Sequence, residues 1–141
     1  MYRTILIPLE NSPTDQTILT HIRPLAQQLG SRLILIHVAD GYAARYQESL
    51  KLAESEEMRE DQHYLDQQRD ILAREGFDVA AHLACGDPTD EIIKMAQREH
   101  VDLIAMSTHG HRLVKDVVLG SVASAVRHRT DIPVLLVRAK T

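Results

Sequence analysis

The sequence has only one cysteine, Cys85, so no intrachain disulfide can form, and this is typical of a protein in a reducing compartment such as the cytoplasm. Long apolar runs are also missing. The longest ones, such as Leu33–Ile36, have the length of a strand and cannot span a membrane. The opening residues MYRTILIPLE reach polar and acidic side chains too early for a secretory signal peptide. We therefore expect a cytoplasmic protein without a membrane partner.

An excess of positive charge is absent as well. The 16 Lys and Arg residues are outnumbered by 20 Asp and Glu residues, which gives a formal net charge of −4. General nucleic-acid binders carry a basic footprint, so we expect no nucleic-acid partner. This charge does not exclude a single bound nucleotide, because one loop can hold phosphate within an acidic protein.

Two glycine-rich phosphate motifs are missing from the sequence. It contains neither G-x-x-x-x-G-K-[ST] nor G-x-G-x-x-G, so neither a P-loop NTPase nor a standard dinucleotide-binding fold is supported. No internal repeat or low-complexity segment divides the chain. Its 141 residues fit a single domain with one core, and we expect residues 1–141 to form it.

Short apolar runs alternate with amphipathic segments along the chain. The runs are too short for helices and predict buried strands at Arg3–Leu9, Arg32–Val38, Asp78–Cys85, Leu103–Met106 and Val134–Val137. Helices are predicted from the Ser12-Pro13 pair to Leu29, from about residue 56 to Glu75, over Asp90–Glu99 with Asp87 and Thr89 as caps, and over Gly120–Arg129. This alternation indicates an α/β fold, a doubly wound parallel sheet with helices on both faces.

Two segments of this pattern leave alternatives open. Pro24 lies inside the first predicted helix and should kink or split it. Residues 42–70 hold eight acidic and four basic side chains. They fit a solvated helix preceded by a mobile excursion, with an acidic partner surface or a nucleotide-sensitive flap as the less favoured interpretation.

The segment Leu103–Ser121, LIAMSTHGHRLVKDVVLGS, has the features of a phosphate site. An apolar run ends at Met106, small and polar residues follow, and Gly120 and Ser121 begin the next predicted helix. Exposed backbone N–H groups and the positive end of a helix dipole favour an anion there. Ligands of parallel α/β sheets lie beyond the carboxyl ends of the strands, so this loop should converge with residues 9–12 and 38–40 if the first and fourth strands are neighbours.

The spacing Ser107-x-x-Gly110, nine residues, Gly120-Ser121 resembles the nucleotide-binding motif of the universal stress protein family, G-x-x-G, nine residues, G-[ST]. The resemblance covers the whole chain through six segments in order: ILIPLENS, LILIHVAD, GDPTDEI, DLIAMSTHG, LGSVASAV and IPVLLV. It implies an adenine nucleotide alpha hydrolase-like fold with five parallel strands in the order 3-2-1-4-5. It also implies bound ATP, ADP or AMP and a homodimer formed through Val134–Val137.

The resemblance also implies roles for single residues. Leu9 and Glu10 would lie at the ribose and phosphates, with the Glu10 carboxylate near Mg²⁺ or a ribose hydroxyl. Val38 would present its backbone to the adenine edge. Met106 and Ser107 would line the ribose. The phosphates would be held by residues of the loop and the last helix: Gly110, His111, Arg112, Gly120, Ser121, Val122 and Ala123.

Two departures from the family pattern affect this site. Ser107 stands where the motif has its first glycine, and its side chain could narrow the site or bond the ligand. Glu10 stands where the family has Asp, so its carboxylate reaches one methylene further. The pair His109-x-His111 fits a phosphate-side role better than zinc, since no third ligand is near. His37, on a strand, should be hydrogen-bonded.

The function implied is that of a cytoplasmic ATP-binding protein of the stress response, a regulatory module whose nucleotide state changes its dimer surface or the surface for an unknown protein partner. One alternative is slow ATP hydrolysis or adenylyl transfer at the same site, ranked lower because no positioned general base or nucleophile is evident. Another is a member that binds no nucleotide and acts through protein contacts. Ser107 favours this last hypothesis, whereas Gly110 and Gly120-Ser121 oppose it.

Overall fold

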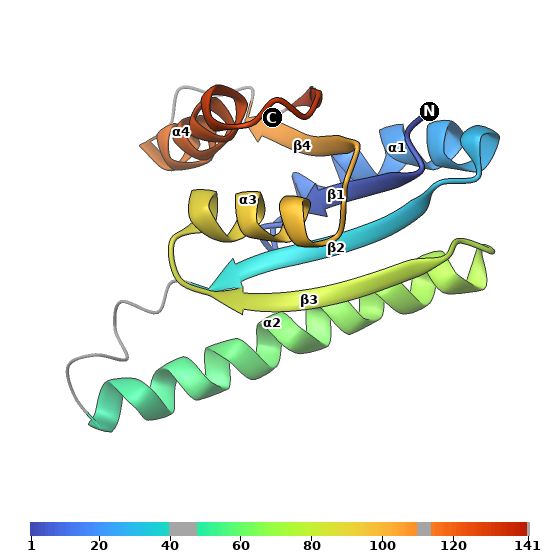
Figure 1. Ribbon diagram of the computed structural model, residues 1–141. Helices are drawn as coiled ribbons and strands as arrows, with labels where there is room; N and C mark the ends of the chain where they lie inside the picture. The colour runs from blue at the N-terminus through green and yellow to red at the C-terminus, as the bar shows by residue number, and fades with distance from the viewer. Residues whose placement is uncertain (40–47, 110–113, 141) are drawn as a thin grey trace.

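The computed structural model describes residues 1–39, 48–109 and 114–140; for residues 48–55, 109 and 114–120 it describes the backbone alone. Strands and helices alternate along the chain (Figure 1). The strands are β1 (Thr4–Pro8), β2 (Arg32–Ala39), β3 (Val79–Cys85), β4 (Leu103–His109) and β5 (Val134–Ala139). The helices are α1 (Asp15–Leu29), α2 (Glu48–Arg74), α3 (Pro88–Arg98) and α4 (Val114–Arg129). The alternating order predicted from the apolar runs is confirmed.

All five strands are parallel and follow the order β3-β2-β1-β4-β5, which confirms the predicted doubly wound sheet. β1 pairs with β2 along its whole length, from Thr4 opposite Arg32 to Pro8 opposite Ile36. On its other side β1 pairs with β4. Among the described residues, this pairing joins only Ile5 with Leu103 and Leu6 with Ile104. The two central strands therefore part toward their carboxyl ends, at the point where the order of the strands reverses.

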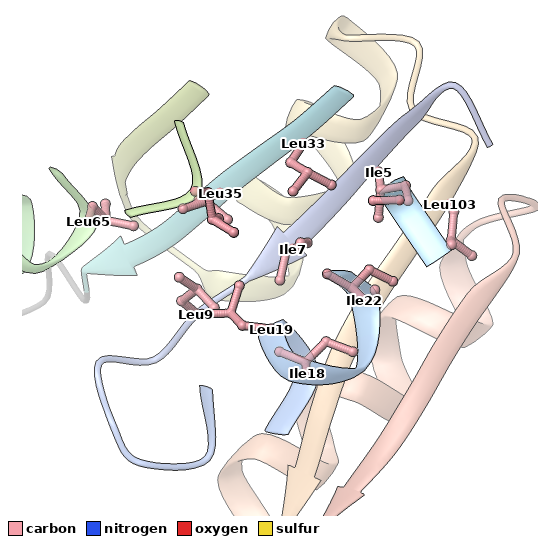
Figure 2. Packing of buried hydrophobic residues seen from close by; sticks show 13 residues of the cluster. Ile5, Ile7, Leu9, Ile18, Leu19, Ile22, Leu33, Leu35, Leu65 and Leu103 are labelled. Atoms are coloured by element: carbon pink, nitrogen blue, oxygen red, sulfur yellow. The ribbon is translucent and has the colours of Figure 1, made fainter. Parts of the chain in front are cut away.

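Two apolar cores lie on the two faces of this sheet. Successive strand residues point to opposite faces, so Ile5 and Ile7 of β1 join the core under α1 and α2, while Leu6 joins the core under α3 and α4. Figure 2 shows the first core, where Ile18 and Ile22 of α1 meet the side chains of β1. Burial on both faces explains why the central strands read as unbroken apolar runs.

Several boundaries differ from the sequence-based prediction. α1 begins at Asp15 with Thr14 as its N-cap, so Ser12 is not the cap. The Ser12 hydroxyl lies two residues earlier and donates to the Glu10 carboxylate. The helix passes through Pro24 as one element and is not split. α2 begins at Glu48, well before residue 56, and in Figure 1 its first turns project past the carboxyl end of β3. α3 begins at Pro88, two residues before the predicted start, so Thr89 lies inside the helix. The predicted cap Asp87 is confirmed, since its carboxylate accepts the Asp90 N–H at 2.9 Å.

The helix predicted to begin at Gly120 begins instead at Val114, so Gly120 and Ser121 lie inside α4. A glycine inside a helix costs only about 1 kcal/mol relative to alanine, and a 16-residue helix can absorb that cost. Likewise β4 continues through Ser107 and Thr108, which lie opposite Val137 and Arg138 of β5. Polar residues extend this strand because its backbone still has a partner.

Replacing Pro24 with alanine should raise the free energy of unfolding by about 2 kcal/mol, since the difference in helix propensity is about 3 kcal/mol and the greater entropy of the unfolded alanine chain offsets about 1 kcal/mol of it. Proline cannot donate to the carbonyl four residues earlier, so this helix lacks the bond that a residue 24 N–H would make with Thr20. The Pro24 side chain is exposed, so the substitution removes little packing. Urea unfolding followed by circular dichroism measures the change, and an equal or lower stability in Pro24→Ala would contradict this expectation.

Candidate functional site

A cavity of about 300 Å³ opens where β1 and β4 part. Its volume lies at the lower end of the range for small-molecule sites. The residues that line it come from the carboxyl ends of β1, β2 and β4, the loop after β1, the starts of α1 and α3, and the middle of α4: Pro8, Leu9, Glu10, Thr14, Asp15, Ile36, His37, Val38, Pro88, Ile92, Met106, Ser107 and Val122. This is the position at which parallel α/β sheets bind ligands.

One wall of the cavity is apolar. Ile36, Ile92 and Met106 belong to the core under α3 and α4, and Val38 and Val122 pack against that core. The remaining wall is polar and comes from the loop between β1 and α1 and from the neighbouring strand ends. A flat apolar ring with polar substituents therefore matches the chemistry of the cavity on both sides.

Asp15 fixes the loop between β1 and α1. Its carboxylate accepts the backbone N–H groups of Glu10, Asn11 and Ser12 at 3.0, 2.9 and 3.3 Å, and it also accepts the Tyr64 hydroxyl. Asp15 is only 2% exposed. Burial raises the pKa of the Asp15 carboxyl, while its hydrogen bonds act in the opposite direction. Burial and the Asp15 carboxylate raise the pKa of Tyr64, so this phenol remains a donor.

Glu10 directs its carboxylate along the same loop. Its Oε1 accepts the hydroxyl of Ser12 at 2.5 Å and that of Thr14 at 2.7 Å. The Glu10 carboxylate lines the cavity and already serves as an acceptor for hydroxyl donors. It could therefore accept a sugar hydroxyl in the same way.

Ser107 uses its hydroxyl inside the fold. It donates to the Thr14 carbonyl at 2.7 Å and accepts the Ile18 N–H at 3.1 Å. Those two groups are four residues apart, the spacing of the partners in the first turn of an α-helix. The hydroxyl thus bridges the start of α1 from β4, and Ser107 is 5% exposed. The sequence left two effects open for Ser107, a narrower site or a bond to the ligand. Its hydroxyl instead bonds two backbone groups of the protein.

Replacing Ser107 with alanine should lower the free energy of unfolding by about 1 kcal/mol, because both hydrogen bonds to α1 are lost. The exposed Ser124→Ala on α4 serves as the matched control and should stay within about 0.5 kcal/mol of the parent protein. Urea unfolding measures both variants. Equal stability of Ser107→Ala and the control would show that the bridge contributes nothing.

Two side chains of α2, Asp61 and Tyr64, contact residues of the polar wall, and Tyr64 does so through its bond to Asp15. Asp61 accepts the Asn11 side-chain amide at 3.0 Å and lies 3.2 Å from His37 Nε2. His37 Nδ1 lies 2.8 Å from the Leu9 carbonyl oxygen, which confirms the expected hydrogen-bonded histidine. Sequence reasoning missed Asp61 and Tyr64, because nothing in an acidic amphipathic helix separates an inward carboxylate from a solvated one. The spacing of Asp61 to the core residue Leu65 was the one available signal.

The structure brings together six residues of the predicted site, since Leu9, Glu10, Val38, Met106, Ser107 and Val122 all line the cavity. Ser121 is exposed, and Ala123, 2% exposed, belongs to the core under α3 and α4; neither lines the cavity. Gly110, His111 and Arg112 lie outside the described residues, and so do the surroundings of Gly120.

Within residues 1–39, 48–109 and 114–140, no group of three or more His, Cys, Asp or Glu side chains is arranged to hold a metal ion. None of the helices in those ranges combines the length and the apolar character that crossing a membrane requires.

Comparison with known proteins assigns the chain to a family. Residues 1–138 match the sequence profile of the universal stress protein family. The chain belongs to this family. The universal stress protein of Methanothermobacter thermautotrophicus is 33% identical over 144 residues, which cover 98% of this chain and 97% of that protein. Universal stress protein MJ0577 of Methanocaldococcus jannaschii is 30% identical over 160 residues, with 99% and 97% covered.

Solved structures of universal stress proteins share the fold. The structure of MJ0577 superposes with a TM-score of 0.88 at 31% identity and covers 100% of this chain and 99% of its own. A universal stress protein from Archaeoglobus fulgidus, solved in complex with dAMP, has a TM-score of 0.67 at 21% identity, with 96% and 97% covered. The resemblance read from the six sequence segments is therefore confirmed at the level of family and fold.

Proposed function

We propose that this universal stress protein binds an adenine nucleotide, with ATP as the foremost candidate, in the cavity between the carboxyl ends of β1 and β4. The observation that carries the proposal is the position of the cavity, about 300 Å³ in volume, at the point where the strand order reverses. The dAMP complex of the Archaeoglobus relative supports the same ligand class.

The two walls suggest how the nucleotide would lie. The adenine ring would pack on the apolar wall of Ile36, Ile92 and Met106, beside the backbone of Val38. The ribose would reach the Glu10 carboxylate, which already accepts hydroxyl donors. The phosphates would then lie near the family motif, which runs from Ser107 in β4 to Ser121 in α4.

A magnesium ion would be held through Glu10. Proteins bind Mg²⁺ through one or two carboxylates together with substrate phosphates, so a single carboxylate at the cavity fits an ion that arrives with the nucleotide. The chemistry it would supply is charge compensation of the phosphates.

The polar wall favours binding over catalysis. Asp15 and Glu10 both accept hydrogen bonds from their own loop, and both His37 nitrogens face oxygen atoms of the protein. These groups hold the wall in place, which suits a regulatory module of the stress response in the cytoplasm better than a hydrolase. No observation in the described residues favours the enzymatic alternative.

Isothermal titration with ATP, ADP, AMP and GTP tests the ligand class. We expect adenine nucleotides to bind with Kd values at least tenfold below that of GTP. ATP should gain affinity when Mg²⁺ is added, whereas AMP should not. An absence of heat with all three adenine nucleotides at millimolar concentration would contradict the proposal.

We also propose a homodimer formed through residues Val134–Val137. β5 lies at the edge of the sheet, where backbone N–H and C=O groups are available for pairing, and its Leu136 is 38% exposed. Native mass spectrometry of freshly purified protein reports mass and bound nucleotide together. A dimer that becomes a monomer in Leu136→Asp is the expected result, and a monomeric parent protein would contradict it.

A further inference from the structure

Asp61 stands out among the charged groups outside the cavity. It is 8% exposed, it lies on α2, and it does not line the cavity. Its two oxygens nevertheless contact residues at the carboxyl ends of β1 and β2, two strands whose ends line the cavity. Oδ1 accepts the amide of Asn11 in the loop after β1, and Oδ2 contacts His37 Nε2 near the end of β2.

We propose that Asp61 is a positioning residue of the nucleotide site, which holds the loop after β1 and the His37 ring in the geometry that the ligand meets. The proposal rests on the function proposed above. It adds a residue from α2, a helix whose described side chains, from residue 56 on, do not line the cavity.

The loop needs support from outside because its conformation is uncommon. Asn11 has a φ of 61°, in the left-handed region, which asparagine occupies more often than other residues with a side chain but which is still uncommon. Asp15 holds its backbone N–H at 2.9 Å, and Asp61 holds its side-chain amide at 3.0 Å. Glu10 precedes Asn11 directly, so a loop that leaves this conformation also carries away the carboxylate at the cavity.

The second contact of Asp61, with His37, is connected to the cavity wall through the His37 ring. The Leu9 carbonyl oxygen can only accept, so His37 Nδ1 donates to it across 2.8 Å. The contact of Nε2 with Asp61 at 3.2 Å fixes the other end of the ring. Leu9 and His37 both line the cavity, so the His37 ring connects two parts of the cavity wall. Asp61 sets the orientation of this ring.

Three variants on α2 test the proposal through the Kd of AMP and ATP. Asp61→Ala removes both contacts and should weaken binding about tenfold. Asp61→Asn should bind like the parent protein, because its amide oxygen can accept from Asn11 and its NH₂ can donate to His37 Nε2. Glu60→Ala, an exposed acidic neighbour, matches the change of charge and should bind like the parent protein.

The pattern separates positioning from other roles. Parent-like binding by a folded Asp61→Ala overturns the proposal, and equal weakening by Asp61→Ala and Asp61→Asn overturns it in favour of a charge effect. Should Asp61→Ala fail to fold, Asn11→Gly keeps the left-handed backbone and removes the amide. It should then weaken binding about threefold, and parent-like binding overturns the proposal.

Amide hydrogen exchange without nucleotide distinguishes failure of this inference from failure of the proposed function. In Asp61→Ala the N–H groups of Glu10, Asn11 and Ser12 should exchange faster than in the parent protein, and in Asp61→Asn they should not. If the parent protein binds no adenine nucleotide, the proposed function fails, and this comparison still decides whether Asp61 positions the loop. Unchanged exchange in Asp61→Ala overturns the inference.

Discussion

Replacing Asp15 with alanine should lower the free energy of unfolding by about 3 kcal/mol. The substitution removes the acceptor of three backbone N–H groups, those of Glu10, Asn11 and Ser12, and of the Tyr64 hydroxyl. A buried donor left without a partner costs about 1–3 kcal/mol, and part of this loop can recover bonds to water. Such a loss is large against the 5–15 kcal/mol that stabilise an ordinary domain.

Urea unfolding at neutral pH measures this loss, with Asp78→Ala as the control. Asp78 is an acidic residue whose side chain is 79% exposed and whose ion-pair distance to Arg32 is 3.9 Å. Its removal should change the free energy of unfolding by no more than about 0.5 kcal/mol. A loss below 1 kcal/mol in Asp15→Ala would show that the loop does not depend on this carboxylate.

The same carboxylate gives stability a pH dependence of defined sign. The pKa of Asp15 is raised above its ordinary value of 3.8 in the folded state, chiefly by burial. The folded protein then holds this proton more tightly than the unfolded chain. The contribution of Asp15 to stability therefore falls as pH rises from 3.8 through the folded-state pKa, and it is constant above that pKa. Subtracting the profile of Asp15→Asn isolates this contribution, and a difference that rises with pH would contradict it.

Filling the cavity should abolish nucleotide binding. Val122 lies on α4, lines the apolar wall and is half-buried. In Val122→Trp an indole would occupy the space proposed for the adenine ring. We expect the Kd for ATP and AMP to rise at least a hundredfold, which corresponds to about 2.7 kcal/mol of binding free energy. Isothermal titration measures the change.

The control for Val122→Trp introduces the same side chain elsewhere. Ile71 on α2 is 38% exposed and does not line the cavity, so Ile71→Trp should bind nucleotide like the parent protein. Circular dichroism verifies that both variants are folded. Binding by a folded Val122→Trp within threefold of the parent protein would place the ligand outside this cavity.

The sheet could be predicted from the sequence because its central strands are buried on both faces. Runs such as Leu33–Ile36 show this burial directly, as unbroken apolar residues of strand length. The cap of α3 could also be predicted, since Asp87 and Pro88 determine a helix start locally. Local chemistry and burial periodicity were sufficient for these elements.

Contacts between distant segments could not be predicted in this way. Ser107 bonds the start of α1 from a strand 89 residues further along the chain. No local pattern announces such a partner, so the serine could only be identified as a departure from the family motif. The support of the loop by Asp61 and Tyr64 also depends on how α2 lies against the sheet. The predicted start of α4 was wrong because Gly120, which lies inside the helix, resembles a helix boundary in the sequence.

Methyl NMR of the four methionines gives the most direct test of nucleotide binding in this cavity. Met106 lines the cavity, whereas Met95 is a buried residue of α3 that does not line it, and Met1 and Met58 lie elsewhere. On titration with ATP or AMP, the Met106 methyl signal should shift and saturate with the Kd from calorimetry, while those of Met1 and Met58 stay in place. An unchanged Met106 signal at saturating nucleotide, or a shift confined to Met1 or Met58, would contradict binding between β1 and β4.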